Sequence, residues 1–331
     1  MTLGMLGTTG LAVSRIGVGL AALGRPGYIN LGHADDLGRD YDVPSMQARA
    51  HAVLDTAWAA GVRYFDAARS YGRAEEFLAA WLRQRRIAPE TVTVGSKWGY
   101  TYTAGWRVEA EHHEIKDHSL ATLTRQLDES RTQLGPYLDL YQIHSATLDS
   151  GVLADRAVLE RLAGLRRDGV AVGLSLSGPH QSETLRRAIE LRVDGERVFD
   201  TVQATWNLLE RSAGPALREA SAAGMGVIVK EALANGRLSA RNGAPSFAPA
   251  RLRLEGVARR LSCTLDALAI AAVLAQPWVD VALSGAATVA QVRSNLAALD
   301  VGWDDAADEH LRAIAEDAPS YWATRGRLAW N

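Results

Sequence analysis

Four side chains that can exchange protons or carry charge stand close to the ends of three short apolar segments. Asp66, Lys97 and His144 each end a run rich in β-branched and aromatic residues, which is typical of a strand, and Tyr71 follows Asp66 by five residues. A tyrosine hydroxyl is a weak acid at neutral pH, but a nearby ammonium group stabilises its phenolate. A carboxylate would hold that ammonium in place, and an imidazole polarises a carbonyl oxygen or relays a proton. The set therefore favours carbonyl reduction with Tyr71 as general acid.

Lysine is scarce in this chain, which makes Lys97 informative. It is one of three lysines, with Lys116 and Lys230, among 36 lysine and arginine residues. A guanidinium group keeps its proton, whereas a desolvated ammonium is a compact charge whose proton affinity can be tuned. A lysine retained at a strand end therefore indicates chemistry that arginine does not perform.

Strands and helices that alternate along the chain must position these residues. The carboxyl ends of neighbouring parallel strands lie side by side, so Asp66, Lys97 and His144 would face one small volume if their strands share a parallel sheet. Eight such strands with helices between them predict a (β/α)8 TIM barrel of the α/β class. The expected strands are 15–19, 62–66, 92–97, 138–144, 171–175, 198–203, 226–230 and 279–283, and the expected helices are 45–60, 74–85, 118–134, 155–167, 181–190, 214–223, 265–275 and 289–299.

The rest of the chain is consistent with one barrel domain over residues 1–331. Gly4, Gly7 and Gly10 mark an N-terminal β-hairpin before the first strand. The doubly wound alternative lacks a Gly-x-Gly-x-x-Gly turn after its first strand. Long segments over 24–44, 100–116 and 235–249 follow barrel strands, so we expect them on the catalytic face.

Composition narrows the class of partner. The net charge of −2 and the isoelectric point near 6.5 provide no basic surface for nucleic acid or an anionic membrane, so a small molecule is the expected partner. The single cysteine, Cys263, is expected to be a buried bystander rather than a nucleophile. No signal peptide or apolar run of bilayer length is visible, and we expect a cytoplasmic protein without a bound metal.

Several motifs resemble those of the aldo-keto reductase superfamily. Residues 64–72 read YFDAARSYG, residues 95–98 read GSKW and residues 139–144 read DLYQIH, and the similarity extends from the N-terminal hairpin to Asn295. The resemblance implies a barrel that binds a nicotinamide cofactor without a Rossmann domain. It also implies that Asp66, Tyr71, Lys97 and His144 form the catalytic tetrad.

The same resemblance implies a set of cofactor contacts, with departures from the family pattern. Leu176 stands where an asparagine is usual after the serine, and the aromatic residue expected after the seventh strand is missing. Lys230 falls near that place, where it would either contact a cofactor phosphate or pair with Glu231. The basic cluster that holds the 2′-phosphate of NADPH is thinned, but Arg293 and Lys230 remain to supply the charge, so NADPH is the expected cofactor and NADH the alternative. The implied cofactor-binding residues are Ser175, Gln203, Lys230, Leu233, Gly285, Gln291, Arg293 and Asn295.

Aromatic residues near the expected barrel mouth predict the substrate side. Tyr28, Trp98 and Trp206 are expected to line a substrate pocket, whereas Trp322 and Trp330 are expected to seal the outer surface. Aromatic walls with few fixed cations suit a neutral aldehyde, ketone or sugar. The polar first loop offers hydrogen-bonding groups for sugar hydroxyls.

Two other functions fit parts of the pattern. A Schiff-base lyase would use Lys97 as its nucleophile, because lysine at a barrel strand end also suits an aldolase. A redox-sensing subunit would keep the barrel and the cofactor but turn over slowly. An NAD(P)(H)-dependent oxidoreductase that interconverts a carbonyl and an alcohol, or a sugar hemiacetal and a lactone, accounts for all four residues together.

The acid role generates a first prediction. Tyr71→Phe is expected to abolish turnover while leaving cofactor affinity within a few-fold, because the hydroxyl acts on the substrate carbonyl and not on the cofactor. Steady-state kinetics and a cofactor-binding titration measure the two effects separately. Full activity in Tyr71→Phe would contradict the mechanism.

Overall fold

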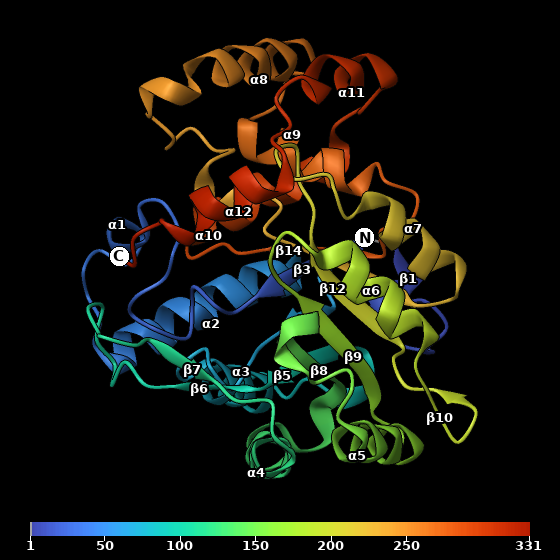
Figure 1. Ribbon diagram of the computed structural model, residues 1–331. Coiled ribbons are helices and arrows are strands. Elements are labelled where there is room, and N and C mark those ends of the chain that lie inside the picture. The colour runs from blue at the N-terminus through green and yellow to red at the C-terminus, as the bar shows by residue number, and fades with distance from the viewer. Residues whose placement is uncertain (1) are drawn as a thin grey trace.

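The computed structural model describes residues 2–331, and its centre is a closed barrel of eight parallel strands (Figure 1). Around the barrel the strand order is β3-β4-β5-β8-β9-β12-β13-β14, which follows the order of the chain. The strands are β3 (Ile16–Gly19), β4 (Tyr64–Asp66), β5 (Thr93–Trp98), β8 (Leu138–Ala146), β9 (Ala171–Leu176), β12 (Thr201–Thr205), β13 (Gly226–Lys230) and β14 (Val281–Ser284). Each overlaps one expected strand, so the (β/α)8 prediction is confirmed.

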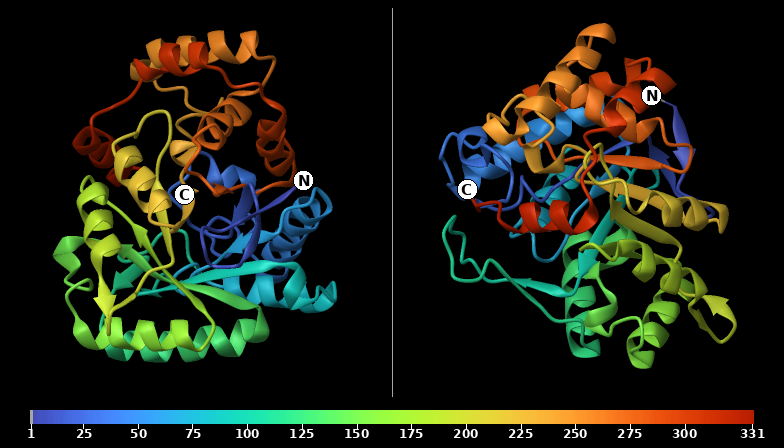
Figure 2. Two further views of the ribbon diagram at one scale, coloured as in Figure 1. Left: turned by 90° about the vertical axis from the view of Figure 1, so that its right-hand side faces the viewer. Right: turned by 45° about the horizontal axis from the view of Figure 1, so that its top comes forward.

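Helices lie between the strands and surround the barrel (Figures 1 and 2). Ser119, Asp155, Thr264 and Thr288 begin four of them, because their side-chain oxygens accept a hydrogen bond from an otherwise unpaired N–H of the first turn. The helices that match the expected ones are α2 (Val43–Ala59), α3 (Ala74–Gln84), α4 (Leu120–Leu134), α5 (Arg156–Arg167), α6 (Gln181–Glu190), α7 (Gly214–Ala222), α9 (Leu265–Leu274) and α10 (Val289–Leu296).

Four further helices were not anticipated. They are α1 (His33–Asp36), α8 (Ala248–Arg260), α11 (Asp305–Arg312) and α12 (Ala318–Gly326). Helices α8 and α11 lie side by side outside the ring of helices (Figures 1 and 2). Much of α8 is polar, with only Leu254, Val257 and Ala258 buried, so its sequence gives a weak periodic signal.

The N-terminal hairpin packs against one end of the barrel. Strands β1 (Leu3–Met5) and β2 (Ala12–Ser14) pair antiparallel, as expected. Leu6 and Val13 bury their side chains against Tyr64, Leu140 and Ile228, which come from three barrel strands. This contact seals the interior at the end opposite the strand carboxyl ends.

Long segments cover the carboxyl ends of the strands. The segment 100–116, expected as a loop, contains a hairpin of β6 (Tyr100–Tyr102) and β7 (Glu114–Lys116), in which Tyr100 pairs with Lys116.

A second small hairpin joins β10 (Arg192–Val193) and β11 (Glu196–Arg197). Within residues 2–331 no helix has the length and apolar character needed to cross a membrane.

The close approach of the hairpin to the barrel generates a second prediction. Gly7 has φ +53°, and a Cβ atom added there would lie 2.2 Å from the Gly226 nitrogen, whereas a Cβ added at Gly10, at φ +81°, meets no atom within 4 Å. Both alanine substitutions cost about 1–2 kcal/mol of backbone strain, and Gly7→Ala adds about 1–3 kcal/mol of overpacking. Denaturant unfolding should therefore show Gly7→Ala as clearly the less stable variant. Equal stabilities would contradict the packing of the hairpin.

Candidate active site

Adjacent strands deliver the four predicted catalytic residues to one place. Asp66 ends β4 and aligns with Gly95 of β5, and Lys97 aligns with Gln142 of β8. Side chains alternate along a strand, so Lys97 points into the barrel while Ser96 and Trp98 point toward the helices. The hydrogen bond from Ser96 Oγ to Glu75 of α3 confirms that outward direction.

Lys97 and Asp66 form a buried ion pair at the floor of the site. The Lys97 ammonium donates to Asp66 Oδ1 and to the Ala67 carbonyl oxygen, the latter at 3.0 Å, and none of its side chain is exposed. Asp66 Oδ2 accepts three further hydrogen bonds from neutral donors. These donors are Tyr64 Oη at 3.1 Å, Gln142 Nε2 at 3.2 Å and Gln203 Nε2 at 2.9 Å. The protein thus supplies hydrogen-bond donors to both oxygens of the buried carboxylate.

Tyr71 is held by a loop that continues the pairing of β4 with β5. The Ala67 and Arg69 N–H groups donate to Gly95 and Lys97 carbonyl oxygens at 2.8 and 3.0 Å. The Tyr71 hydroxyl lies 3.4 Å from His144 Nε2, and the two rings meet edge to face with centroids 5.3 Å apart. Lys97 Nζ lies 5.0 Å from the centroid of the Tyr71 ring. The tetrad is therefore assembled in contact.

Burial sets the protonation of the two rings. It lowers the pKa of His144 well below its usual value, and the Lys97 and Arg25 cations lower it further, so the imidazole is neutral. Burial also raises the pKa of Tyr71, the Asp66 carboxylate raises it further, and only Arg25 opposes them substantially. The sequence predicts that Lys97 stabilises the Tyr71 phenolate. That role of Lys97 stays a prediction, because the largest influences on the pKa of Tyr71 are burial, the Asp66 carboxylate and Arg25.

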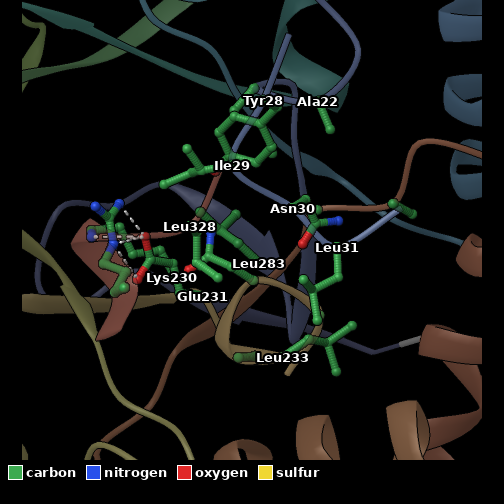
Figure 3. Close-up of a pocket in the computed structure, with 18 of the residues that line it drawn as sticks. Ala22, Tyr28, Ile29, Asn30, Leu31, Lys230, Glu231, Leu233, Leu283 and Leu328 are labelled. Atoms are coloured by element: carbon green, nitrogen blue, oxygen red, sulfur yellow. Dashed lines mark hydrogen bonds and ion pairs between the residues drawn. The ribbon is translucent and has the colours of Figure 1, made fainter. Parts of the chain in front are cut away.

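A cavity of about 560 Å³ opens above this floor. Figure 3 shows residues that line it, among them Tyr28, Asn30 and Leu233. Asp66, Tyr71, His144 and Gln203 contribute to its base. One wall comes from the first loop, the β6–β7 hairpin and the C-terminal tail, and includes Arg25, Tyr28, Tyr100, Glu114 and Trp330. The other wall comes from the segments after β13 and β14 and includes Leu233, Arg241, Asp266, Gly285, Gln291 and Asn295.

Arg25 is a site residue that the sequence analysis missed. Only 3% of its side chain is exposed, and its guanidinium carbon lies 4.8 to 5.1 Å from the ring centroids of Tyr28, Tyr71 and Trp330. Its Nη1 donates to the Ser70 carbonyl oxygen at 3.1 Å and to Glu114 at 2.9 Å, while the buried Nε has no partner. In a chain so rich in arginine, no sequence signal singles this one out.

A second ion pair joins the tail to the barrel. Arg325 of α12 donates to both carboxylate oxygens of Glu231, just after β13, and Thr205 donates to the same group at 3.1 Å. Burial would raise the pKa of Glu231, but Arg325 and Lys230 lower it to about 2. Lys230 donates to Thr205 Oγ1 at 2.9 Å, and burial lowers the pKa of its ammonium to about 8. Figure 3 shows Lys230 and Glu231 on the cavity wall.

Most of the predicted cofactor residues line the cavity. The six that do so are Gln203, Lys230, Leu233, Gly285, Gln291 and Asn295. Ser175 lies behind the floor, where its Oγ accepts a hydrogen bond from the Ser145 N–H at 2.9 Å. Arg293 is exposed on α10 and does not line the cavity. Asn295 is buried, and its Oδ1 atom has no hydrogen-bond partner.

The aromatic predictions divide. Tyr28 lines the cavity, but Trp98 and Trp206 do not, which corrects the expectation that they wall the substrate pocket. Trp98 points outward on β5 and packs against His118, and Trp206 packs against Trp278. Trp330, expected to seal the surface, instead faces the cavity, where it stacks on His113 with ring centroids 3.9 Å apart. The alternation of side chains along β5 turns Trp98 away from the cavity, and the docking of the C-terminal tail brings Trp330 to it.

Trp322 fits its expected sealing role. It is 8% exposed and packs in a satellite core with Tyr321.

Among residues 2–331, histidine, cysteine and carboxylate groups form no cluster of three arranged to hold a metal ion.

Comparison with known proteins places these features in a wider context. Residues 15–316 match the model of the aldo/keto reductase family. Pyridoxal 4-dehydrogenase of Microbacterium luteolum is 27% identical, with 88% of this chain and 91% of that protein covered. NADH-specific methylglyoxal reductase of Escherichia coli is 25% identical, with 94% and 97% covered. The holo structure of an aldo-keto reductase from Bacillus halodurans superposes with a TM-score of 0.72 at 23% identity, over 96% of this chain and 97% of that one.

The buried ion pair generates a third prediction. Asp66→Asn leaves the Lys97 ammonium buried without a counter-charge, which is expected to lower the free energy of unfolding by about 3–5 kcal/mol. Glu160→Gln removes an exposed ion pair with Arg156 and serves as the control, with a change of about 0.5 kcal/mol or less. Urea unfolding followed by tryptophan fluorescence measures both. Similar small effects would show that Lys97 and Asp66 are not coupled as described.

Proposed function

Because the chain belongs to the aldo/keto reductase family, whose members are nicotinamide-dependent oxidoreductases, we propose that it interconverts a small carbonyl compound and its alcohol at the floor of this cavity. The oxidised partner is an aldehyde, a ketone or the lactone of a sugar hemiacetal. One observation carries the proposal. Tyr71 Oη and His144 Nε2 lie 3.4 Å apart at the cavity floor, with Lys97 Nζ 5.0 Å from the tyrosine ring.

The side chains have distinct roles in this proposal. When bound, the nicotinamide supplies or accepts the hydride at the carbonyl carbon. Tyr71 binds the carbonyl oxygen and donates its proton to that oxygen, and the neutral His144 holds the oxygen from a second side through Nε2. The raised pKa of Tyr71 keeps its proton in place until negative charge develops on the substrate. The phenolate that remains lies near the Lys97 and Arg25 cations, which stabilise it.

The environment of Lys97 supports a charge-stabilising role over a nucleophilic one. Its nitrogen donates to Asp66 and Ala67, and the residue does not line the cavity. An aldehyde therefore has no direct path to the nitrogen. A Schiff-base lyase would need that path, so borohydride treatment with an aldehyde is expected to leave no adduct on Lys97.

The walls indicate the substrate class. The Arg25–Glu114 and Arg325–Glu231 pairs are each electrically balanced, and aromatic rings flank them. Such walls suit an uncharged carbonyl compound with polar substituents. The names of two relatives, a pyridoxal 4-dehydrogenase and a methylglyoxal reductase, also describe small carbonyl substrates. As the composition led us to expect, we propose that the enzyme acts in the cytoplasm on free small molecules.

A fourth prediction tests the function. The protein is expected to consume reduced nicotinamide cofactor in the presence of small aldehydes, and Lys97→Met should lower kcat/KM by at least about a hundredfold, because the phenolate loses one of its two neighbouring cations. Lys116→Met is the matched control, since the Lys116 ammonium donates to the Ser145 carbonyl oxygen and its side chain does not line the cavity. Its kcat/KM should stay within about twofold.

The outcomes separate the alternatives. Cofactor binding without turnover on any aldehyde, ketone or sugar would favour a redox-sensing subunit. Loss of activity in Lys116→Met equal to that in Lys97→Met would show that the effect of the lysine is not local to the tetrad. Circular dichroism of each variant establishes that the fold is retained.

A further inference from the structure

The cavity extends well beyond the tetrad, and its distal end has a distinct chemistry. We call this the distal end, defined by Arg241, Asp266, Gln291, Ser294 and Asn295, all of which line the cavity. It lies beside the segment after β14 and the start of α10, where Thr288 caps the first turn. In TIM barrels the loops after the seventh and eighth strands, with a helix N-terminus, are the usual place for a phosphate group.

This placement orients a dinucleotide. The nicotinamide must lie over Tyr71 for hydride transfer, and the opposite wall is closed by Arg25, Tyr28, Glu114 and Trp330. With the nicotinamide there, Gly285 and the α10 N-terminus would hold the pyrophosphate, and the residues of the distal end would meet the adenosine ribose. The groups at that end decide whether the ribose carries a free 2′-hydroxyl or a 2′-phosphate.

The charge of the distal end is unfavourable for a phosphate. Asp266, the second residue of α9, lines the cavity and accepts a hydrogen bond from Ser294 Oγ at 3.3 Å. The cation on this part of the wall, Arg241, is already engaged. Its guanidinium donates to both carboxylate oxygens of Asp36 and to the Leu31 and Gly32 carbonyl oxygens.

The neighbouring amides offer no compensation. Gln291 Nε2 also donates to Asp36, at 2.9 Å, so this donor is occupied as well. Asp36, which does not line the cavity, is paired with Arg241, so the Asp266 carboxylate on the cavity wall has no unpaired cation to balance it. A 2′-phosphate, which brings up to two further negative charges, would meet repulsion there without a free cation.

The two cations suggested by the sequence do not reach the distal end. Lys230 lies near Thr205 and Glu231, close enough to the tetrad for its charge to lower the pKa of His144. Arg293 is exposed and outside the cavity. The cations that would favour NADPH are therefore placed elsewhere.

The distal end instead offers acceptors for hydroxyl and amino groups. Asn295 is 1% exposed, donates through Nδ2 to Ser284 Oγ at 2.8 Å and leaves Oδ1 buried without a partner. An unpartnered acceptor of this kind points to a ligand that donates hydrogen bonds. A carboxylate beside it is the group that binds a ribose 2′-hydroxyl in NAD-dependent sites of other folds.

We propose that Asp266 makes this enzyme selective for NAD(H) against NADP(H), by accepting a hydrogen bond from the ribose hydroxyls and repelling a 2′-phosphate. This inference rests on the proposed function, because it takes the nicotinamide end of the ligand to lie over Tyr71. Asp266 is a specificity residue and touches no reacting atom.

Binding of cofactor halves tests the distal end independently of catalysis. Isothermal titration with AMP and with adenosine 2′,5′-bisphosphate, and with NADH and NADPH, gives four dissociation constants for the full chain. The unphosphorylated ligand of each pair is expected to bind at least about tenfold more tightly. Equal or tighter binding of the 2′-phosphorylated ligands would overturn the selectivity. Binding of none of the four would overturn both this inference and the proposed function.

Two variants and a control assign the effect to the carboxylate. Asp266→Asn keeps the side-chain shape without the charge, and Asp266→Ser is a smaller replacement that also suits a helix start. Both are expected to tighten NADPH binding by about tenfold and to change NADH binding by less than about threefold. Asp305→Asn makes the same charge change in the first turn of α11, outside the cavity, and should alter neither. An unchanged NADPH-to-NADH ratio in both Asp266 variants would overturn the role of Asp266.

Discussion

The site depends on one buried ion pair. A lysine ammonium without contact with water is costly unless a counter-charge and hydrogen-bond acceptors surround it, and Lys97 has Asp66 and the Ala67 carbonyl oxygen. Asp66 in turn needs the donors on Tyr64, Gln142 and Gln203. These residues come from β4, β5, β8 and β12, so satisfying one charge fixes the carboxyl ends of four strands relative to one another. A slip of one residue in β5 would turn Lys97 toward the helices and leave Asp66 unpaired.

The same network places the loop that carries Tyr71. Arg69 in that loop pairs with Glu75 of α3 and Glu129 of α4, and Ser96 and Ser130 donate to Glu75. On the outward side of β5, Ser96 therefore contacts the carboxylate that holds the loop. On the inward side, Lys97 contributes the positive charge of the site. Burial then keeps Tyr71 protonated and His144 neutral, which suits a proton donor beside an imidazole that does not compete for the proton.

The cavity walls divide binding into two parts. On the side of the first loop and the tail, balanced ion pairs and aromatic rings surround the tetrad, and Arg25 contributes a fixed cation against Tyr71. On the side of α9 and α10, the wall carries the Asp266 carboxylate, and the nearby cation Arg241 is already paired with Asp36. The two walls come from distant parts of the chain and are joined where Arg241 and Gln291 donate hydrogen bonds to Asp36.

The sequence by itself determined the barrel, the hairpin and the tetrad, because strand-helix alternation and residues at strand ends are local patterns. It placed Asp66, Tyr71, Lys97 and His144 together, since neighbouring parallel strands share an edge. Only the tertiary structure decided which side chains face the cavity. Trp98 turns outward by strand alternation, Arg25 becomes a wall residue by folding of the first loop, and Trp330 arrives through docking of the tail. The Asp266 carboxylate lacks a free cation beside it because Arg241 is paired with Asp36, more than two hundred residues away in the chain. The sequence near Asp266 or Arg241 contains no pattern that predicts a pairing at that range.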